Sequence, residues 1–259
     1  MAQEQGCPVG EVVVDRRIVR HVKRWKAGAF LGICALATAC GSTSSTPSYA
    51  DTHTAQQIIG DASASTGAAT TFHLSIDATT PQGEATADFD IQGTNVSGKL
   101  TAQGLTIRIT HVGSETFVYG ADLAAILQSS NAQAAAKIKA KASDKWILMP
   151  ADFWPSTGID ALTAFQKMTS CFTTAAGLVK KGTIPVSGRT AILIEDTAFS
   201  RLYVDPEPPH YFMRIDVNSS EKCLTDTSVS AETTVLTKVG SDLQVSAPSG
   251  FVSLASVVG

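Results

Sequence analysis

Three segments in the first half of the chain alternate strictly between apolar and polar side chains. They are residues 72–77 (FHLSID), 87–91 (ADFDI) and 105–110 (LTIRIT). Successive side chains of a β-strand point to opposite faces, so this pattern predicts strands with one apolar and one solvated face. Turn residues at 81–83 (PQG) and 93–95 (GTN) separate neighbouring segments. The chain is therefore predicted to form an antiparallel meander whose apolar face needs a cover.

The remaining patterns supply more strands and the helices that can cover them. Apolar residues recur every three or four positions in 52–66, 122–142 and 159–172, which predicts helices there. Further strands are predicted at 95–101, 115–119, 145–150, 189–195, 199–204, 210–217 and 228–238, and 245–252 forms either another strand or a closing tail. Hairpins with a few helices inserted between them are typical of an α+β domain. The simplest arrangement is an antiparallel sheet curled around its helices.

Residues 1–39 have the order of a bacterial export signal. A basic cluster at 16–26 precedes an uncharged apolar run at 27–39, and small side chains end that run directly before Cys40. The run is shorter than the roughly 20 residues that a membrane-spanning helix needs. A plain signal peptide cut after Ala39 and a single transmembrane anchor are the alternatives. Small residues before a Cys at this place resemble the lipobox of bacterial lipoproteins. The resemblance implies that Cys40 carries an acyl chain such as palmitate and becomes the new N-terminus.

This interpretation divides the chain into three parts. Residues 1–39 are the signal peptide, residues 40–51 are the lipidated Cys and a flexible Ser/Thr-rich tether, and residues 52–259 are one domain. We expect the domain at the cell membrane, held by its lipid anchor on the extracytoplasmic face.

Two cysteines are left once the signal is removed and Cys40 carries the lipid. They are Cys171 and Cys223. In an oxidising compartment an even number of cysteines predicts a disulfide, here one that closes a long loop. The alternative is a pair of buried thiols.

The sequence contains no motif of a known catalytic or cofactor site. The H-E-x-x-H, G-x-S-x-G, phosphate-loop and dinucleotide-binding patterns are all missing, and the 5 histidines are scattered. The formal net charge is −3 even with the basic leader included, which argues against non-specific binding of nucleic acid. We therefore expect no enzyme activity, no metal and no cofactor.

Four short segments follow one another in a pattern of their own. They are 117–119 (FVY) and 145–150 (KWILMP), followed by 182–191 (GTIPVSGRTA) and 201–215 (RLYVDPEPPHYFMRI). They resemble actinobacterial cell-envelope lipoproteins of the half-barrel group, related to the LolA/LolB and LppX/LprG lipoproteins. The resemblance implies a single curved antiparallel sheet with helices packed on its concave face, enclosing an apolar cavity for acyl chains or glycolipids. The Cys171–Cys223 pair is not part of this pattern.

The resemblance also makes a set of apolar side chains candidates for the cavity wall. They are Leu162, Phe165, Met168, Phe172 and Trp146. From periodicity alone, the four residues on the 159–172 helix are ordinary core. Trp146 could shape the cavity mouth or simply fill volume.

Two functions are consistent with these observations. The first is a membrane-anchored exported lipoprotein that binds or carries lipid or glycolipid in an apolar cavity. The alternative is a structural or sensory cell-envelope module with a filled core that binds another protein. We expect the membrane as a partner through acylated Cys40, a lipid or glycolipid as the ligand, and a monomer as the working state.

Overall fold

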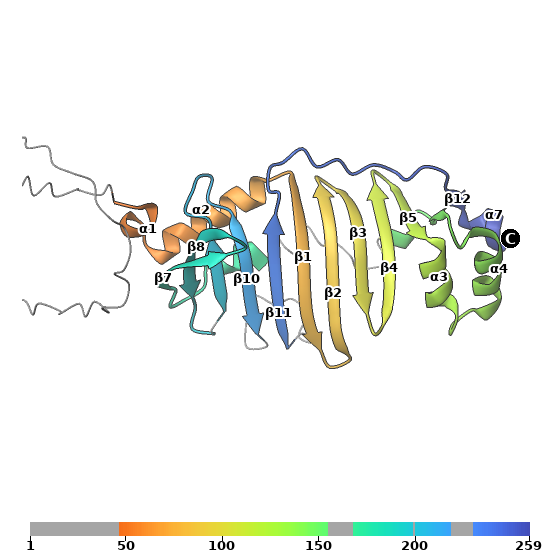
Figure 1. Ribbon diagram of the computed structural model, residues 1–259, viewed down its shortest axis with the longest axis horizontal. Helices are drawn as coiled ribbons and strands as arrows, with labels where there is room; N and C mark the ends of the chain where they lie inside the picture. The colour runs from red at the N-terminus through yellow and green to blue at the C-terminus, as the bar shows by residue number, and fades with distance from the viewer. Residues whose placement is uncertain (1–46, 155–167, 199, 219–229) are drawn as a thin grey trace, which may run out of the picture. The chain divides into compact units, whose positions relative to one another are not determined.

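A computed structural model shows how the chain folds (Figure 1) and describes residues 47–154, 168–198, 200–218 and 230–259. The first half contains α1 (Tyr49–Thr52), α2 (Ala55–Ala68), β1 (Thr71–Thr80), β2 (Gly83–Gln92), β3 (Asn95–Ala102), β4 (Leu105–Val112), β5 (Glu115–Tyr119), α3 (Gly120–Leu127), α4 (Ala132–Ala142) and β6 (Trp146–Leu148). The second half contains β7 (Val179–Val186), β8 (Arg189–Glu195), β9 (Arg201–Val204), β10 (Phe212–Asn218), β11 (Ala231–Thr237), β12 (Val252–Ser253) and α7 (Leu254–Val258).

The strands of the described residues form one open sheet of 12 strands. Their order is β12-β6-β5-β4-β3-β2-β1-β11-β10-β9-β8-β7. Two antiparallel meanders, β1 to β5 and β7 to β11, meet where β1 pairs with β11. Strand β12 is the exception, since it pairs with β6 in parallel. The arrangement confirms the predicted α+β class, a single curved and mostly antiparallel sheet that does not close on itself.

The alternation along the strands separates an apolar inner face from a polar outer face. Leu74 of β1 is paired with Phe89 of β2, and both are buried on the inner face. One position earlier, His73 is paired with Asp90, and His73 Nδ1 lies 2.8 Å from Asp90 Oδ1 on the outer face. The sequence period of two therefore sets which side of the sheet becomes the core.

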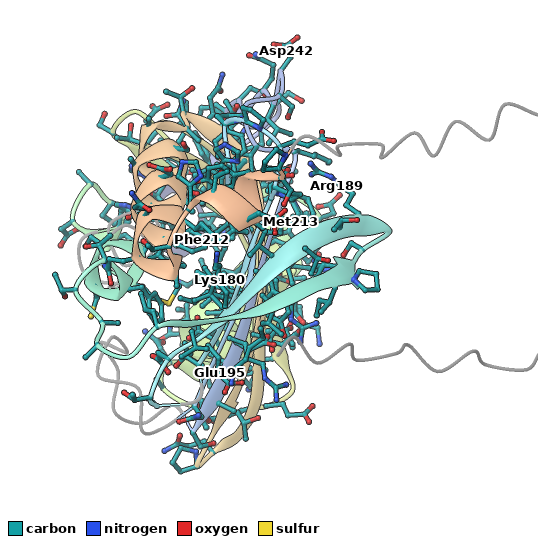
Figure 2. All side chains as sticks on the ribbon, turned by 90° about the vertical axis from the view of Figure 1, so that its left-hand side faces the viewer. Lys180, Arg189, Glu195, Phe212, Met213 and Asp242 are labelled. Carbon is teal, nitrogen blue, oxygen red and sulfur yellow. The ribbon has the colours of Figure 1, made fainter. Side chains whose placement is uncertain are left out.

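Helix α2 covers the inner face at the β9–β10 side of the sheet. It begins at a capping box, in which Thr54 and Gln57 satisfy each other's backbone N–H groups. The backbone N–H of Phe212 in β10 donates to Thr66 Oγ1 of α2 at 3.1 Å. Figure 2 shows Phe212 towards α2 and Met213 on the other side, towards the β7–β8 hairpin. Successive residues of β10 thus pack into different clusters. Phe212 belongs to the main core, and Met213 belongs to a smaller cluster with Val186, Ala191 and Tyr203.

The prediction of one helix over 122–142 was wrong, because the chain forms two helices there. Helix α3 ends at Leu127, and α4 begins after Asn131. Asn131 is the N-cap of α4, since its side chain accepts the backbone N–H of Ala134 at 3.0 Å. The polar residues before it interrupt the apolar pattern, so α4 can turn back along α3. Figure 1 shows α3, α4 and α7 together at the β5–β6–β12 end of the sheet.

Most of the other predicted elements are confirmed. The short helix near 52–66 is α2, and the five predicted strands from 72 to 119 are β1 to β5. The 245–252 segment is mainly a tail, because strand pairing begins only at Val252. Of the predicted helix 159–172, residues 168–172 are helical, and its earlier part lies outside the described residues.

Candidate functional site

An apolar pocket lies between helix α3 and the inner face of strands β3 to β5. Its volume is about 420 Å³, within the range of about 300–1,000 Å³ that is usual for small-molecule sites. The described residues that line it are all apolar: Leu100, Ile107, Ile109, Val118, Leu123, Ile126, Leu127, Met149, Phe153 and Leu254. These side chains offer no charge and no strong hydrogen-bonding group, so the pocket suits a hydrocarbon chain.

The floor of the pocket follows from strand register. Leu100 of β3 is paired with Ile107 of β4, so both side chains emerge on the same face. Two residues further along β4, Ile109 is paired with Val118 of β5. Because these positions are two apart, the alternation that predicted the strands also collects these side chains on one surface.

Helix α3 forms the opposite wall. Ile126 and Leu127 follow Leu123 by three and four positions, so the three side chains share one face of the helix. The helix begins at Gly120, where a Cβ atom would collide with the carbonyl oxygen of Ala142 in α4. A glycine at this position lets the start of α3 pack closely against the end of α4.

Arg108 of β4 and Asp122 of α3 hold this helix against the sheet. The backbone N–H and Nε of Arg108 both donate to Asp122 Oδ2 at 2.8 Å, and Nη2 donates to Oδ1 at 2.8 Å. The guanidinium carbon also lies 3.7 Å from the centre of the Tyr119 ring. These hydrogen bonds to Asp122 raise the pKa of Arg108 above its ordinary value. Strand β5 pairs with β4 only from Ile109 onward, so Asp122 replaces the missing strand partner of the Arg108 N–H.

A buried polar pair lies on the same face, two positions along the strands from the Ile109–Val118 pair. His111 of β4 is paired with Thr116 of β5, and His111 Nδ1 lies 2.9 Å from the Thr116 hydroxyl. The imidazole stacks on Trp154, with centroids 4.3 Å apart and planes 5° apart. Burial lowers the pKa of His111, so its imidazole is neutral at pH 7. This end of the inner face is polar but carries no histidine charge.

The described residues that were predicted to line a cavity do not line this pocket. Met168 and Phe172 belong to the main hydrophobic core, where Phe172 is fully buried. Trp146 is half-buried at the start of β6. Leu162 and Phe165 lie outside the described residues. A cavity-lining role for these five side chains stays a prediction.

The residues that do line the pocket carried a signal in the sequence. Leu123, Ile126 and Leu127 have helical spacing, and Ile107 and Ile109 alternate with polar residues along a strand. Each pattern predicts an apolar surface. Neither pattern specifies that the two surfaces face each other across a space, because that depends on how α3 is tied to β4.

The predicted lipidation site and disulfide fall wholly or partly outside the described residues. Cys40 precedes the first described residue, and Cys223 lies in the segment 219–229. Cys171 is partly buried and packs against the main core. Acylation of Cys40 and the Cys171–Cys223 disulfide therefore stay predictions.

Two other pockets on the described part of the chain have charged side chains in their walls. One pocket of about 320 Å³ lies along β1, β2 and β11, and another of about 250 Å³ lies beside Arg189 and Asp205. Within the described ranges, no group of three or more His, Cys, Asp or Glu side chains could hold a metal ion. In the same ranges, no helix has the length and apolar character needed to cross a bilayer.

No protein-family model matches this chain, and no curated protein matches its sequence. Solved structures match its fold. LprF from Mycobacterium bovis aligns with a TM-score of 0.52 at 12% sequence identity, over 76% of this chain and 97% of LprF. The lipoprotein LppX from Mycobacterium tuberculosis aligns with a TM-score of 0.45 at 15% identity, over 74% of this chain and 98% of LppX. Identities this low establish fold and not function. By its likeness to LprF, the chain has the half-barrel fold that its sequence predicts.

Proposed function

We propose that this protein is an exported lipoprotein, anchored by acylated Cys40, that binds the hydrocarbon part of a lipid or glycolipid in the pocket between α3 and the sheet. The observation that carries the proposal is the apolar lining that the described residues give to that pocket. Each methylene moved from water into such a site contributes about 0.8 kcal/mol to binding. About ten buried methylenes would therefore contribute roughly 8 kcal/mol, which corresponds to a micromolar dissociation constant, and no catalytic residue is required.

The leader sequence supports the location of this activity. A short tether would join Cys40 to the first described residue, Pro47. Since an extended chain spans at most about 3.5 Å per residue, the tether would keep the domain within about 25 Å of the membrane surface. The pocket would then work next to the membrane that supplies its ligand.

Two measurements test the proposal. Native mass spectrometry of protein purified without detergent should show an adduct of lipid size. A fluorescent fatty acid, such as dansyl-undecanoic acid, should bind saturably and be displaced by an unlabelled fatty acid. A bare polypeptide mass together with no saturable probe binding would count against the proposal and favour the alternative, a module that binds another protein.

A further inference from the structure

Part of the wall of the apolar pocket is Leu254, which belongs to residues 251–259, here called the strap. The strap contains β12 and α7 and reaches its place after a long irregular connection from β11. Figure 1 shows this connection running along the ends of the strands to the far side of the sheet. Leu254 of the strap lines the pocket, and Val257 is buried in the main core. The strap therefore completes the site from a distant part of the sequence.

The backbone of the strap is joined to the sheet through one short strand pair, and Phe251 of the strap packs edge-on against Phe117 of β5, with ring centroids 5.0 Å apart. Strand β12 has 2 residues, and its register pairs Val252 with Ile147 and Ser253 with Leu148 of β6. Helix α7 has 5 residues and is capped by the side chain of Ser253, which accepts the backbone N–H of Ser256 at 3.2 Å. A helix this short has little stability of its own, so its packing and β12 hold it in place.

Two lysines of α4 hold the other end of the strap. Lys137 Nζ donates to the carbonyl oxygen of Val258 at 2.7 Å, and Lys141 Nζ donates to that of Val257 at 3.2 Å. A lysine ammonium group on a flexible stem exchanges readily between such carbonyls and water. These bonds can therefore break and re-form without disturbing α4.

The chain before the strap is suited to act as a hinge. Val245 is held by its backbone N–H, which donates to Gln92 Oε1 at 3.0 Å. Among the described residues, Ser246 to Gly250 make no hydrogen bond to another element. Gly250 has a φ of 70° and no neighbour within 4 Å of a Cβ position, so a conformationally free residue directly precedes the strap.

From these contacts we infer that the strap is a movable wall of the pocket, and that its release from β6 lets a lipid chain pass in and out. The inference rests on the proposed lipid binding and adds how that site is opened. When β12 leaves β6, Leu254 leaves the pocket with it, while β3, β4, β5 and α3 stay in place.

A disulfide across the β6–β12 pair tests the inference. The Ile147→Cys/Val252→Cys double variant joins residues that are register partners on adjacent strands. Adjacent strands lie about 4.8 Å apart, which suits the separation of roughly 4.4–6.8 Å between the Cα atoms of a disulfide. With the bridge oxidised, association and dissociation of dansyl-undecanoic acid should each slow by about tenfold or more. Reduction with dithiothreitol should restore both rates.

The matched control is a bridge that cannot affect the strap. Thr101 of β3 and Thr106 of β4 are register partners, and their hydroxyl oxygens lie 3.0 Å apart. The Thr101→Cys/Thr106→Cys variant should exchange the probe at the same rate when oxidised and reduced. Unsubstituted protein under the same reducing conditions reports any effect of the predicted Cys171–Cys223 disulfide.

The outcomes separate this inference from the proposed function. If the probe binds and the Ile147–Val252 bridge does not change its exchange, the movable strap is wrong and lipid binding stands. If no form of the protein binds the probe, the proposed function fails and the inference falls with it. A second variant that ends at Gly250 should exchange the probe faster than the full chain, because it has lost the wall that Leu254 provides. Slower or unchanged exchange in the shortened chain would also overturn the inference.

Discussion

Asp122 of α3 accepts the backbone N–H of Arg108 as well as two hydrogen bonds from its guanidinium group. One carboxylate thus ties a helix to both the backbone and the side chain of a strand. The neighbouring residues Ile107 and Leu123 line the pocket from the strand and the helix respectively. The width of the pocket therefore depends on this ion pair.

Replacing Asp122 by Asn tests how strongly this ion pair stabilises the fold. The substitution keeps the size of the side chain and removes its charge. We expect the free energy of unfolding to fall by about 1–3 kcal/mol, the usual worth of hydrogen bonds to a charged group. Urea unfolding followed by circular dichroism measures the change. Asp88→Asn is the control, because Asp88 is half exposed on the outer face and should cost at most about 0.5 kcal/mol. Equal effects at the two sites would contradict a special role for Asp122.

Filling the pocket should weaken ligand binding without unfolding the protein. Ile126 lines the pocket and is only half-buried, so Ile126→Trp can place its ring in the open space. We expect binding of the fluorescent fatty acid to weaken at least about tenfold, a change of roughly 1.4 kcal/mol. Val179→Trp is the matched control, since Val179 is 50% exposed on β7, at the other end of the sheet. If both variants bind the probe like the unsubstituted protein, the ligand does not occupy this pocket.

The buried imidazole of His111 should make stability depend on pH. Burial lowers its pKa in the folded protein, so around pH 6.5 the unfolded chain binds a proton that the folded chain does not. Stability attributable to this group is therefore lost as the pH falls through about 6.5, and the loss levels off below the folded pKa. The size of the loss is about 1.4 kcal/mol for each unit by which the pKa is lowered.

The measurement compares unsubstituted protein with His111→Gln. Removing the Thr116 interaction lowers the stability of the variant at every pH, but the variant has no imidazole to titrate at this position. The free energy of unfolding should therefore drop more in the unsubstituted protein than in the variant between about pH 7.5 and 5.5. If the free energy of unfolding, measured with urea, falls equally with pH in both proteins across this range, burial of His111 does not affect its protonation.

The sequence predicted the sheet well because its signal is local. Residues such as Phe72, Leu74 and Ile76 alternate with polar neighbours, and this alternation is sufficient to define both a strand and its buried face. The break between α3 and α4 was missed because the Ala-rich stretches on both sides of 128–131 (QSSN) favour helix, whereas the break depends on the cap at Asn131. The position of the pocket was missed for another reason. The pocket forms only where Leu254 and Ile107 line the same space, and no local pattern relates residues so far apart in the chain.

The cysteine count predicts a disulfide between Cys171 and Cys223. In the chain-entropy account, a bridge over a loop of this length contributes on the order of 4 kcal/mol to stability. Thiol labelling of the denatured, unreduced mature protein, followed by mass spectrometry, should find neither cysteine labelled. After reduction, both should become labelled and the urea midpoint should fall. Labelling of both cysteines before reduction would show that they are thiols.

The lipid anchor is tested by changing Cys40 to Ser. In a bacterial host fed an alkyne analogue of palmitate, the unsubstituted protein should incorporate the label and Cys40→Ser should not. Incorporation is the better measurement than membrane association, because an uncleaved apolar run at 27–39 could itself hold the protein on a membrane. Cys34→Ser is the matched control, since the bulky Ile33 precedes Cys34 and should prevent its modification. Labelling of the Cys40→Ser protein would show that a residue other than Cys40 carries the acyl chain. A single acyl chain alone would give only marginal membrane binding. If only Cys40→Ser loses the label, Cys40 carries the acyl chain. The short tether then keeps the pocket close to the membrane from which its ligand is proposed to come.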